Sequence, residues 1–181
     1  MTQTLSVSRR TDIPAFYAGW FVNRLKAGAV PVRHPYSKKL VRISLRPEDV
    51  SAVVFWSKNY TPLLSRLERI EKTVKNLFFH FTITANESLS PIRPTIGMQY
   101  KDSVFLARKY SAGQVLRRFD PICITDRPSF EVHEERLMRC PELMKGCAKE
   151  CIISFVHPYR SVHSSLKRCS IPVFLSSGKQ A

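Results

Sequence analysis

The stretch SVSRRTDIPAFY, residues 6–17, contains both kinds of unit from which the fold is built. A short alternating run of apolar and polar residues ends in two arginines, a threonine and an aspartate, and an apolar, helix-like segment follows at once. This pattern predicts a strand whose carboxyl end carries charged side chains, followed directly by a helix. If the rest of the chain repeats the unit, the charges of several strands will gather at one end of a sheet.

The unit does recur along the chain. Segments rich in β-branched and aromatic residues predict strands at 6–8, 51–56, 77–84, 114–119 and 151–156. Apolar residues spaced three or four apart predict helices at 15–28, 61–74 and 130–144. Alternation of strands and helices favours parallel pairing, because a helix can return the chain to the starting edge of the sheet.

Two segments interrupt the alternation. Residues 29–50 contain two short extended runs around the turn-prone YSKK, which predicts a hairpin excursion after the first helix. Residues 85–99 contain prolines and few periodic apolar residues, and we expect a loop there.

Composition limits the class of protein. A chain of 181 residues with 44% hydrophobic and 24% charged residues is typical of a single globular domain. Lys and Arg number 29 against 14 Asp and Glu, which gives a formal net charge of +15. That excess favours an anionic small molecule or nucleic acid as a partner, and the alternative is a basic, solvated surface.

Location follows from three further features. The N-terminus has no positive segment followed by an apolar core, and the apolar runs are too short to cross a membrane. The five cysteines are odd in number and irregularly spaced, which is typical of a reduced protein rather than a disulfide scaffold. We therefore expect a cytoplasmic protein with no membrane contact.

Polar side chains follow each predicted strand. In parallel α/β proteins ligands bind at the carboxyl ends of the strands, so these residues are candidates for a shared anion site. The alternative is a set of structural ion pairs that cap the sheet. The candidate ligand-binding residues are Arg9, Arg10, Asp12, Lys58, Asn59, Thr82, Arg118 and Asp120.

Other motifs are missing or weak. The chain has no Walker loop and no GxGxxG, HExxH or GxSxG motif, so no catalytic residues are assigned. The segment CPELMKGCAKEC, residues 140–151, holds three cysteines, but their spacing differs from the paired ligands of metal sites. We expect buried free thiols there and no metal ligands. His80 lies within a predicted strand, where an interior or lumen histidine is expected.

Four segments together resemble a known family: SVSRRTDIPAFY, VVFWSKN, VLRRFDPI and CIISFV, in that order. They resemble a bacterial domain-of-unknown-function family (number eighteen forty-eight), whose members look like (β/α) barrels related to radical S-adenosylmethionine enzymes. The resemblance reaches about residue 166, so we expect a barrel domain over 1–166 and a divergent tail over 167–181. It implies that seven of the candidate residues lie at the mouth of the barrel: Arg9, Arg10, Asp12, Lys58, Asn59, Arg118 and Asp120.

The same resemblance implies a difference from the family. Full-length members carry a CxxxCxxC cluster that holds a [4Fe–4S] centre with S-adenosylmethionine, and no such motif occurs here. We expect a C-terminally truncated, partial (β/α) TIM-like barrel. It should have five to six parallel strands, helices outside and no cofactor of its own. An open sheet edge would allow self-association.

Two function classes remain open at this stage. The chain is either a relative of radical S-adenosylmethionine enzymes that lacks the cluster, or a non-catalytic basic module that binds an anionic ligand or nucleic acid at the strand ends. The sequence does not decide whether it is an enzyme.

Overall fold

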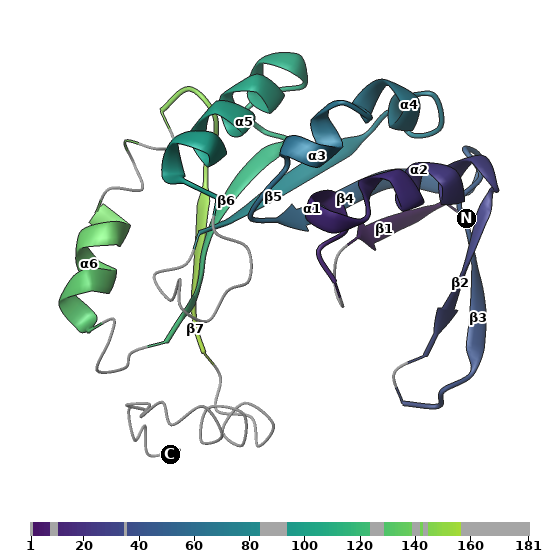
Figure 1. Ribbon diagram of the computed structural model, residues 1–181, viewed down its shortest axis with the longest axis horizontal. Coiled ribbons are helices and arrows are strands. Elements are labelled where there is room, and N and C mark those ends of the chain that lie inside the picture. The colour runs from purple at the N-terminus through teal and green to yellow at the C-terminus, as the bar shows by residue number, and fades with distance from the viewer. Residues whose placement is uncertain are drawn as a thin grey trace.

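The computed structural model describes residues 2–7, 11–34, 36–83, 94–123, 129–138, 142 and 145–156. Its centre is a sheet of five parallel strands in the order β1-β4-β5-β6-β7, which forms a half-barrel with helices around it (Figure 1). The strands are β1 (Gln3–Val7), β4 (Val50–Ser57), β5 (Leu77–Ile83), β6 (Val115–Ile122) and β7 (Cys151–Phe155). The predicted partial barrel with parallel strands is therefore confirmed, although the strand bounds differ by a few residues.

The hairpin excursion is also confirmed. β2 (Ala29–Arg33) and β3 (Leu40–Ser44) form a separate two-stranded antiparallel sheet, which projects away from the half-barrel (Figure 1). Gly28, with φ of +67°, lies directly before β2, where a left-handed backbone turns the chain out of the preceding helix.

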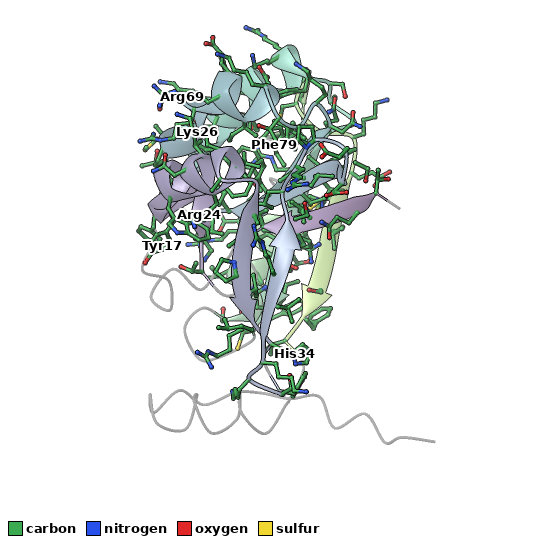
Figure 2. The ribbon with its side chains drawn as sticks, turned by 90° about the vertical axis from the view of Figure 1, so that its right-hand side faces the viewer. Tyr17, Arg24, Lys26, His34, Arg69 and Phe79 are labelled. Atoms are coloured by element: carbon green, nitrogen blue, oxygen red, sulfur yellow. The ribbon has the colours of Figure 1, made fainter. Side chains whose placement is uncertain are left out.

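Strand periodicity separates the two faces of the sheet. In β5 the side chains of Leu77, Phe79, Phe81 and Ile83 are buried, and the residues between them are only partly buried. The buried set lies beneath the helices, so the alternate residues face the concave side of the half-barrel. The core therefore lies between the sheet and its helices, and Figure 2 shows Phe79 inside this body.

The predicted first helix is two helices. α1 (Ile13–Phe16) and α2 (Ala18–Lys26) are separated at Tyr17, whose φ of −127° is not helical. The first one starts earlier than predicted because Asp12 caps it and a proline occupies its first turn.

The second predicted helix is likewise divided, into α3 (Thr61–Leu64) and α4 (Leu67–Glu71). The third one corresponds to α6 (Phe130–Met138); the end or kink that the sequence predicts at Pro141 lies outside the described residues.

The expectation of a loop over 85–99 is wrong at its end. α5 (Ile96–Lys109) begins inside that range, with the Thr95 hydroxyl oxygen accepting a hydrogen bond from the Met98 N–H at 3.2 Å. The pattern missed this helix because its buried positions include the polar residues Gln99 and Ser103, which weaken the apolar periodicity. Within the described residues, no helix has the length and apolarity that a membrane span requires.

Candidate functional site

The carboxyl ends of β1 and β4 are joined by Asp12. Its Oδ1 accepts a hydrogen bond from the Ala15 N–H at 3.0 Å, and its Oδ2 accepts one from the Ser57 hydroxyl at 2.8 Å. Burial raises the pKa of Asp12, although these hydrogen bonds and the neighbouring Lys58 act in the opposite direction. Asp12 therefore stabilises the structure, because it caps the N-terminus of α1 and links the ends of β1 and β4.

The carboxyl ends of β4 and β5 are joined by Gln99 of α5. Its side-chain N–H group donates to the carbonyl oxygens of Lys58 at 2.9 Å and Thr82 at 3.3 Å. Asn59 accepts a hydrogen bond from the Thr61 N–H at 3.1 Å and so helps to start α3. Backbone and side-chain polar groups at this edge thus hold the strands in register.

The predicted site residues separate into three groups. Arg9 and Arg10 lie outside the described residues. Lys58 and Asn59 follow β4 beside Asp12, as described above. The remaining three lie on β5 and β6, where Thr82 pairs in register with Arg118, and Asp120 comes two residues later.

A row of side chains crosses the concave face of the sheet, and we call it the concave row: Trp56 of β4, His80 of β5, and Arg118 and Asp120 of β6. The register pairs Trp56 with His80, and their ring centroids are 4.4 Å apart. The guanidinium carbon of Arg118 lies 4.5 Å from the centroid of the Trp56 ring, within the range of a cation–π contact.

Asp120 fixes the orientation of Arg118. Arg118 Nε donates to Asp120 Oδ2 at 3.1 Å, and Arg118 Nη2 donates to the same oxygen. The Ser154 hydroxyl of β7 lies 3.4 Å from that oxygen. The two charged side chains are 16% and 14% exposed. Because a partly buried ion pair is less screened than a surface pair, the guanidinium is held in one orientation.

Two nitrogen atoms of the concave row are buried without a hydrogen-bond partner among the described residues: Trp56 Nε1 and His80 Nδ1. Buried polar atoms in folded proteins nearly always have a partner. The indole nitrogen is a donor only, and the imidazole nitrogen either donates or accepts, according to its tautomer. A ligand with acceptor oxygens could satisfy the indole here.

The charge state of His80 follows from its surroundings. Burial lowers the pKa of His80, and the positive charge of Arg118 lowers it further, while Asp120 opposes both. The ring is therefore neutral near pH 7. The fixed positive charge of the concave row belongs to Arg118.

Sequence reasoning named Arg118 and Asp120, but it missed Trp56 and Ser154 and treated His80 as an interior or lumen residue. The useful signal was the two-residue period of the strands. Phe55, Phe79 and Phe119 are buried in the core. Because side chains alternate between the two faces of a strand, the next or preceding residues, Trp56, His80 and Arg118, lie on the opposite face.

The described thiols do not form a metal site. Among the described residues no group of three His, Cys, Asp or Glu side chains could hold a metal ion. Cys123 and Cys147 are buried, and Cys151 is partly buried in β7. Cys140 and Cys169 lie outside the described residues. The described cysteines thus do not fit a [4Fe–4S] centre.

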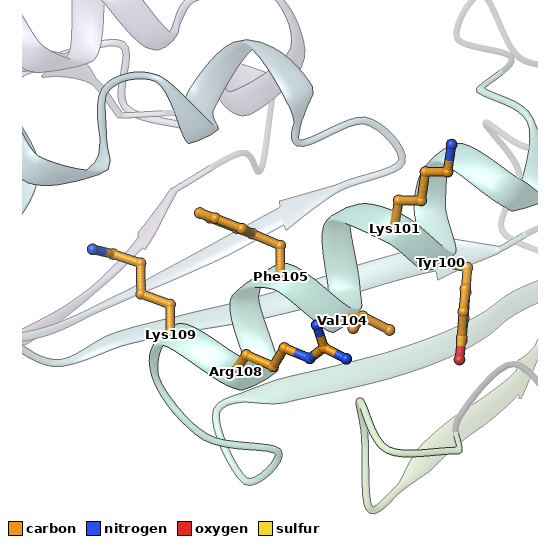
Figure 3. A pocket seen from close by; sticks show the side chains of 6 residues that line it. All are labelled: Tyr100, Lys101, Val104, Phe105, Arg108 and Lys109. Atoms are coloured by element: carbon orange, nitrogen blue, oxygen red, sulfur yellow. The ribbon is translucent and has the colours of Figure 1, made fainter.

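A hollow lies on the outer surface of α5 (Figure 3). It is lined by one helix only, on the side that faces away from the sheet, whereas Ser103 and Leu106 of the same helix are buried. One of its cations, Lys109, already pairs with Glu71 at 3.2 Å. We therefore place the candidate site at the concave row. The residues that line the hollow are Tyr100, Lys101, Val104, Phe105, Arg108 and Lys109.

The fold and the concave row define a class: a parallel α/β half-barrel with a polar, partly buried inner face. The chain belongs to the family described as "Domain of unknown function (DUF1848)", whose model matches residues 4–180. No curated protein and no solved structure matches the chain at a significant level.

Proposed function

We propose that this protein binds a small anionic ligand, through carboxylate or phosphate oxygens, at the concave row. The observation that carries the proposal is the fixed orientation of the Arg118 guanidinium. Its guanidinium is oriented by Asp120 on one side and by the Trp56 ring on the other. A guanidinium held in one plane is preorganised for the planar, two-oxygen geometry of a carboxylate or phosphate.

The neighbouring donors support an oxygen-rich ligand. The hydrogen bonds that Arg118 makes to the described part of the chain come from Nε and Nη2, and both end on Asp120. Nη1 is a further donor. The indole N–H of Trp56 has no hydrogen-bond partner among the described residues, so an acceptor oxygen would find two donors in the concave row.

Lys58 follows β4 at the same edge of the sheet and adds positive charge to the approach. The formal charge of the whole chain, +15, would attract an anion from solution.

Binding of inorganic phosphate, measured by titration calorimetry on the full chain, tests the proposal. Arg118→Gln should weaken binding at least about tenfold, equivalent to about 1.4 kcal/mol. Arg69→Gln on α4 is the matched control, because Arg69 is exposed on the helical side (Figure 2). It removes one positive charge far from the concave face and should leave the affinity unchanged.

Because Arg118→Gln leaves the Asp120 carboxylate without its partner, a second variant is needed. Arg118→Gln combined with Asp120→Asn removes both charges of the pair and so avoids an uncompensated carboxylate. It should also lose phosphate binding while it unfolds cooperatively near the wild-type temperature. Equal phosphate affinity in the wild type and this folded double variant would contradict the proposal.

A radical enzyme of the S-adenosylmethionine type is the second candidate. The parallel half-barrel is the observation that favours it, since such a barrel is what the family resemblance implied. Iron content and the absorbance of the chain after anaerobic reconstitution distinguish the two candidates. A stoichiometric iron–sulfur cluster would favour the enzyme.

A further inference from the structure

The β2–β3 hairpin and the residues directly after it carry a strong excess of positive charge. Residues 29–46 contain five Lys and Arg residues and no Asp or Glu, so this segment supplies +5 of the total charge of +15. The cations are Arg33, Lys38, Lys39, Arg42 and Arg46. A concentration of one charge sign on a single projecting element is typical of a surface that binds a polyanion.

The two faces of the hairpin differ. The register pairs Val30 with Ile43, and both pack against the hydrophobic core. On the other face, the register pairs Arg33 with Leu40, and Arg42 with a proline. These side chains are exposed. The base of the hairpin is therefore attached to the body through its apolar face, and its basic face is open to solvent.

The hairpin also has a defined shape and reach. It projects from the half-barrel, and His34 lies at its distal end (Figures 1 and 2). Arg33 Nη1 donates to the Lys38 carbonyl at 3.1 Å, which closes the connection between the strands. Tyr36 in that connection is 89% exposed. Five residue pairs make a ribbon about 17 Å long.

We propose that this hairpin binds double-stranded DNA through its phosphates. A two-stranded ribbon has the width that the major groove admits, and its row of arginines and lysines complements the phosphate charge. A single strand is a poorer match, since proteins that bind single strands present several stacking aromatic side chains. The described part of the hairpin between residues 29 and 46 offers one Phe, Tyr or Trp side chain, Tyr36, next to the ring of His34. This proposal is independent of the concave row.

Fluorescence anisotropy with a 20-base-pair duplex tests the proposal. If all five cations contact phosphates, the slope of log K against log salt is about −4.5, and affinity falls roughly 500-fold between 50 and 200 mM salt. Lys39→Gln combined with Arg42→Gln should reduce the magnitude of the slope by about two. Both side chains are exposed, so this variant should fold normally.

Two control variants make the result specific. Lys72→Gln combined with Lys75→Gln removes the same charge from two exposed positions after α4 and should leave the slope unchanged. Lys39→Arg combined with Arg42→Lys keeps the charge on the hairpin and should retain binding. Arg118→Gln should leave duplex binding unchanged. This result would show that duplex binding does not depend on the anion site at the concave row.

Three outcomes would overturn the proposal: no duplex binding at 50 mM salt, an equal loss in the hairpin and control charge variants, or a clear preference for single strands. In the first case, binding to vesicles of anionic lipid would identify a membrane surface as the partner of the hairpin.

Discussion

The two faces of the parallel sheet perform different tasks although the same strands build them. On the helix-covered face, Phe55, Phe79 and Phe81 are fully buried and form the centre of the core. On the concave face, one residue away along the chain, Trp56 and His80 are partly buried and contain nitrogen atoms without hydrogen-bond partners among the described residues. The alternation of side chains along a strand thus puts the buried core residues on one face and the polar groups of the candidate site on the other.

Two adjacent arginines show the difference most clearly. Arg117 is 0% exposed beneath α5, where its Nη2 donates to the Ser103 hydroxyl at 2.6 Å and its guanidinium lies 5.5 Å from the Phe81 ring centroid. Arg118 lies on the other face beside Trp56. The same side chain is a packed element of the core in one position and a candidate ligand contact in the next.

The largest expected effect is on the helix-covered face. Phe79→Ala removes a fully buried ring that contacts Phe55, Tyr60 and Tyr110, and it should lower the free energy of unfolding by about 3–5 kcal/mol. Phe78→Ala is the matched control on the concave face, where burial is partial, and its loss should be clearly smaller. Urea unfolding measures both. Equal losses would remove the distinction between the faces.

The strand ends should show an intermediate effect. Asp12→Ala removes the cap of α1 and the acceptor for Ser57, and it should cost about 1–2 kcal/mol of unfolding free energy. Asp12→Asn retains an acceptor oxygen and should cost less. If the two variants unfold at the same urea concentration, the hydrogen bonds of Asp12 do not stabilise the junction.

A smaller effect is expected from pH on the concave face. The pKa of His80 is below its ordinary value of 6.5 in the folded chain, so the unfolded chain takes up this proton first as the pH falls below that value. Neutral His80 therefore contributes to the free energy of unfolding above pH 6.5, and this contribution is lost as the pH falls. The free energy of unfolding should therefore decrease less between pH 7.5 and 5.5 in His80→Gln than in the wild type. An identical decrease would show that His80 is not held neutral.

The smallest expected change concerns the cysteines. Cys151 pairs in register with Arg117, and Cys147 Sγ lies 3.8 Å from Arg117 Nη2, so both belong with the helix-covered side rather than the concave row. Anaerobic reconstitution of the full chain with iron and sulfide should leave it without a stoichiometric cluster. Four irons per chain that depend on Cys147 and Cys151 would contradict this expectation.

Much of the fold could be predicted from residues 6–17 and the segments that repeat their pattern. Strong β-branched and aromatic runs identified the five parallel strands, and a turn-prone stretch identified the hairpin. Helix bounds were less predictable. Tyr17 interrupts a periodic segment, and α5 buries two polar side chains: Gln99 donates to the Lys58 carbonyl, and Ser103 accepts a hydrogen bond from Arg117 of β6. No local pattern carries that information.

The candidate site was predictable only in part. Charges at the strand ends indicated Arg118 and Asp120, but their pairing depends on two residues of one strand lying on the same face. The contribution of Trp56 and His80 depends on the register between β4 and β5, which requires the assembled sheet. Aromatic residues in a strand first suggest core packing, and the two-residue period alone does not show that Trp56 and His80 are neighbours.

The two tryptophans of the chain allow the central claim to be tested directly. Trp56 lies in the concave row, and Trp20 lies on α2 with 46% of its surface exposed. Indole N–H signals in a ¹H–¹⁵N NMR spectrum, assigned with Trp20→Phe, report on both sites during a titration with inorganic phosphate. We predict a saturable shift of the Trp56 signal, no shift of the Trp20 signal, and loss of the Trp56 shift in Arg118→Gln. A Trp56 signal that does not move, or that moves equally in Arg118→Gln, would contradict the account.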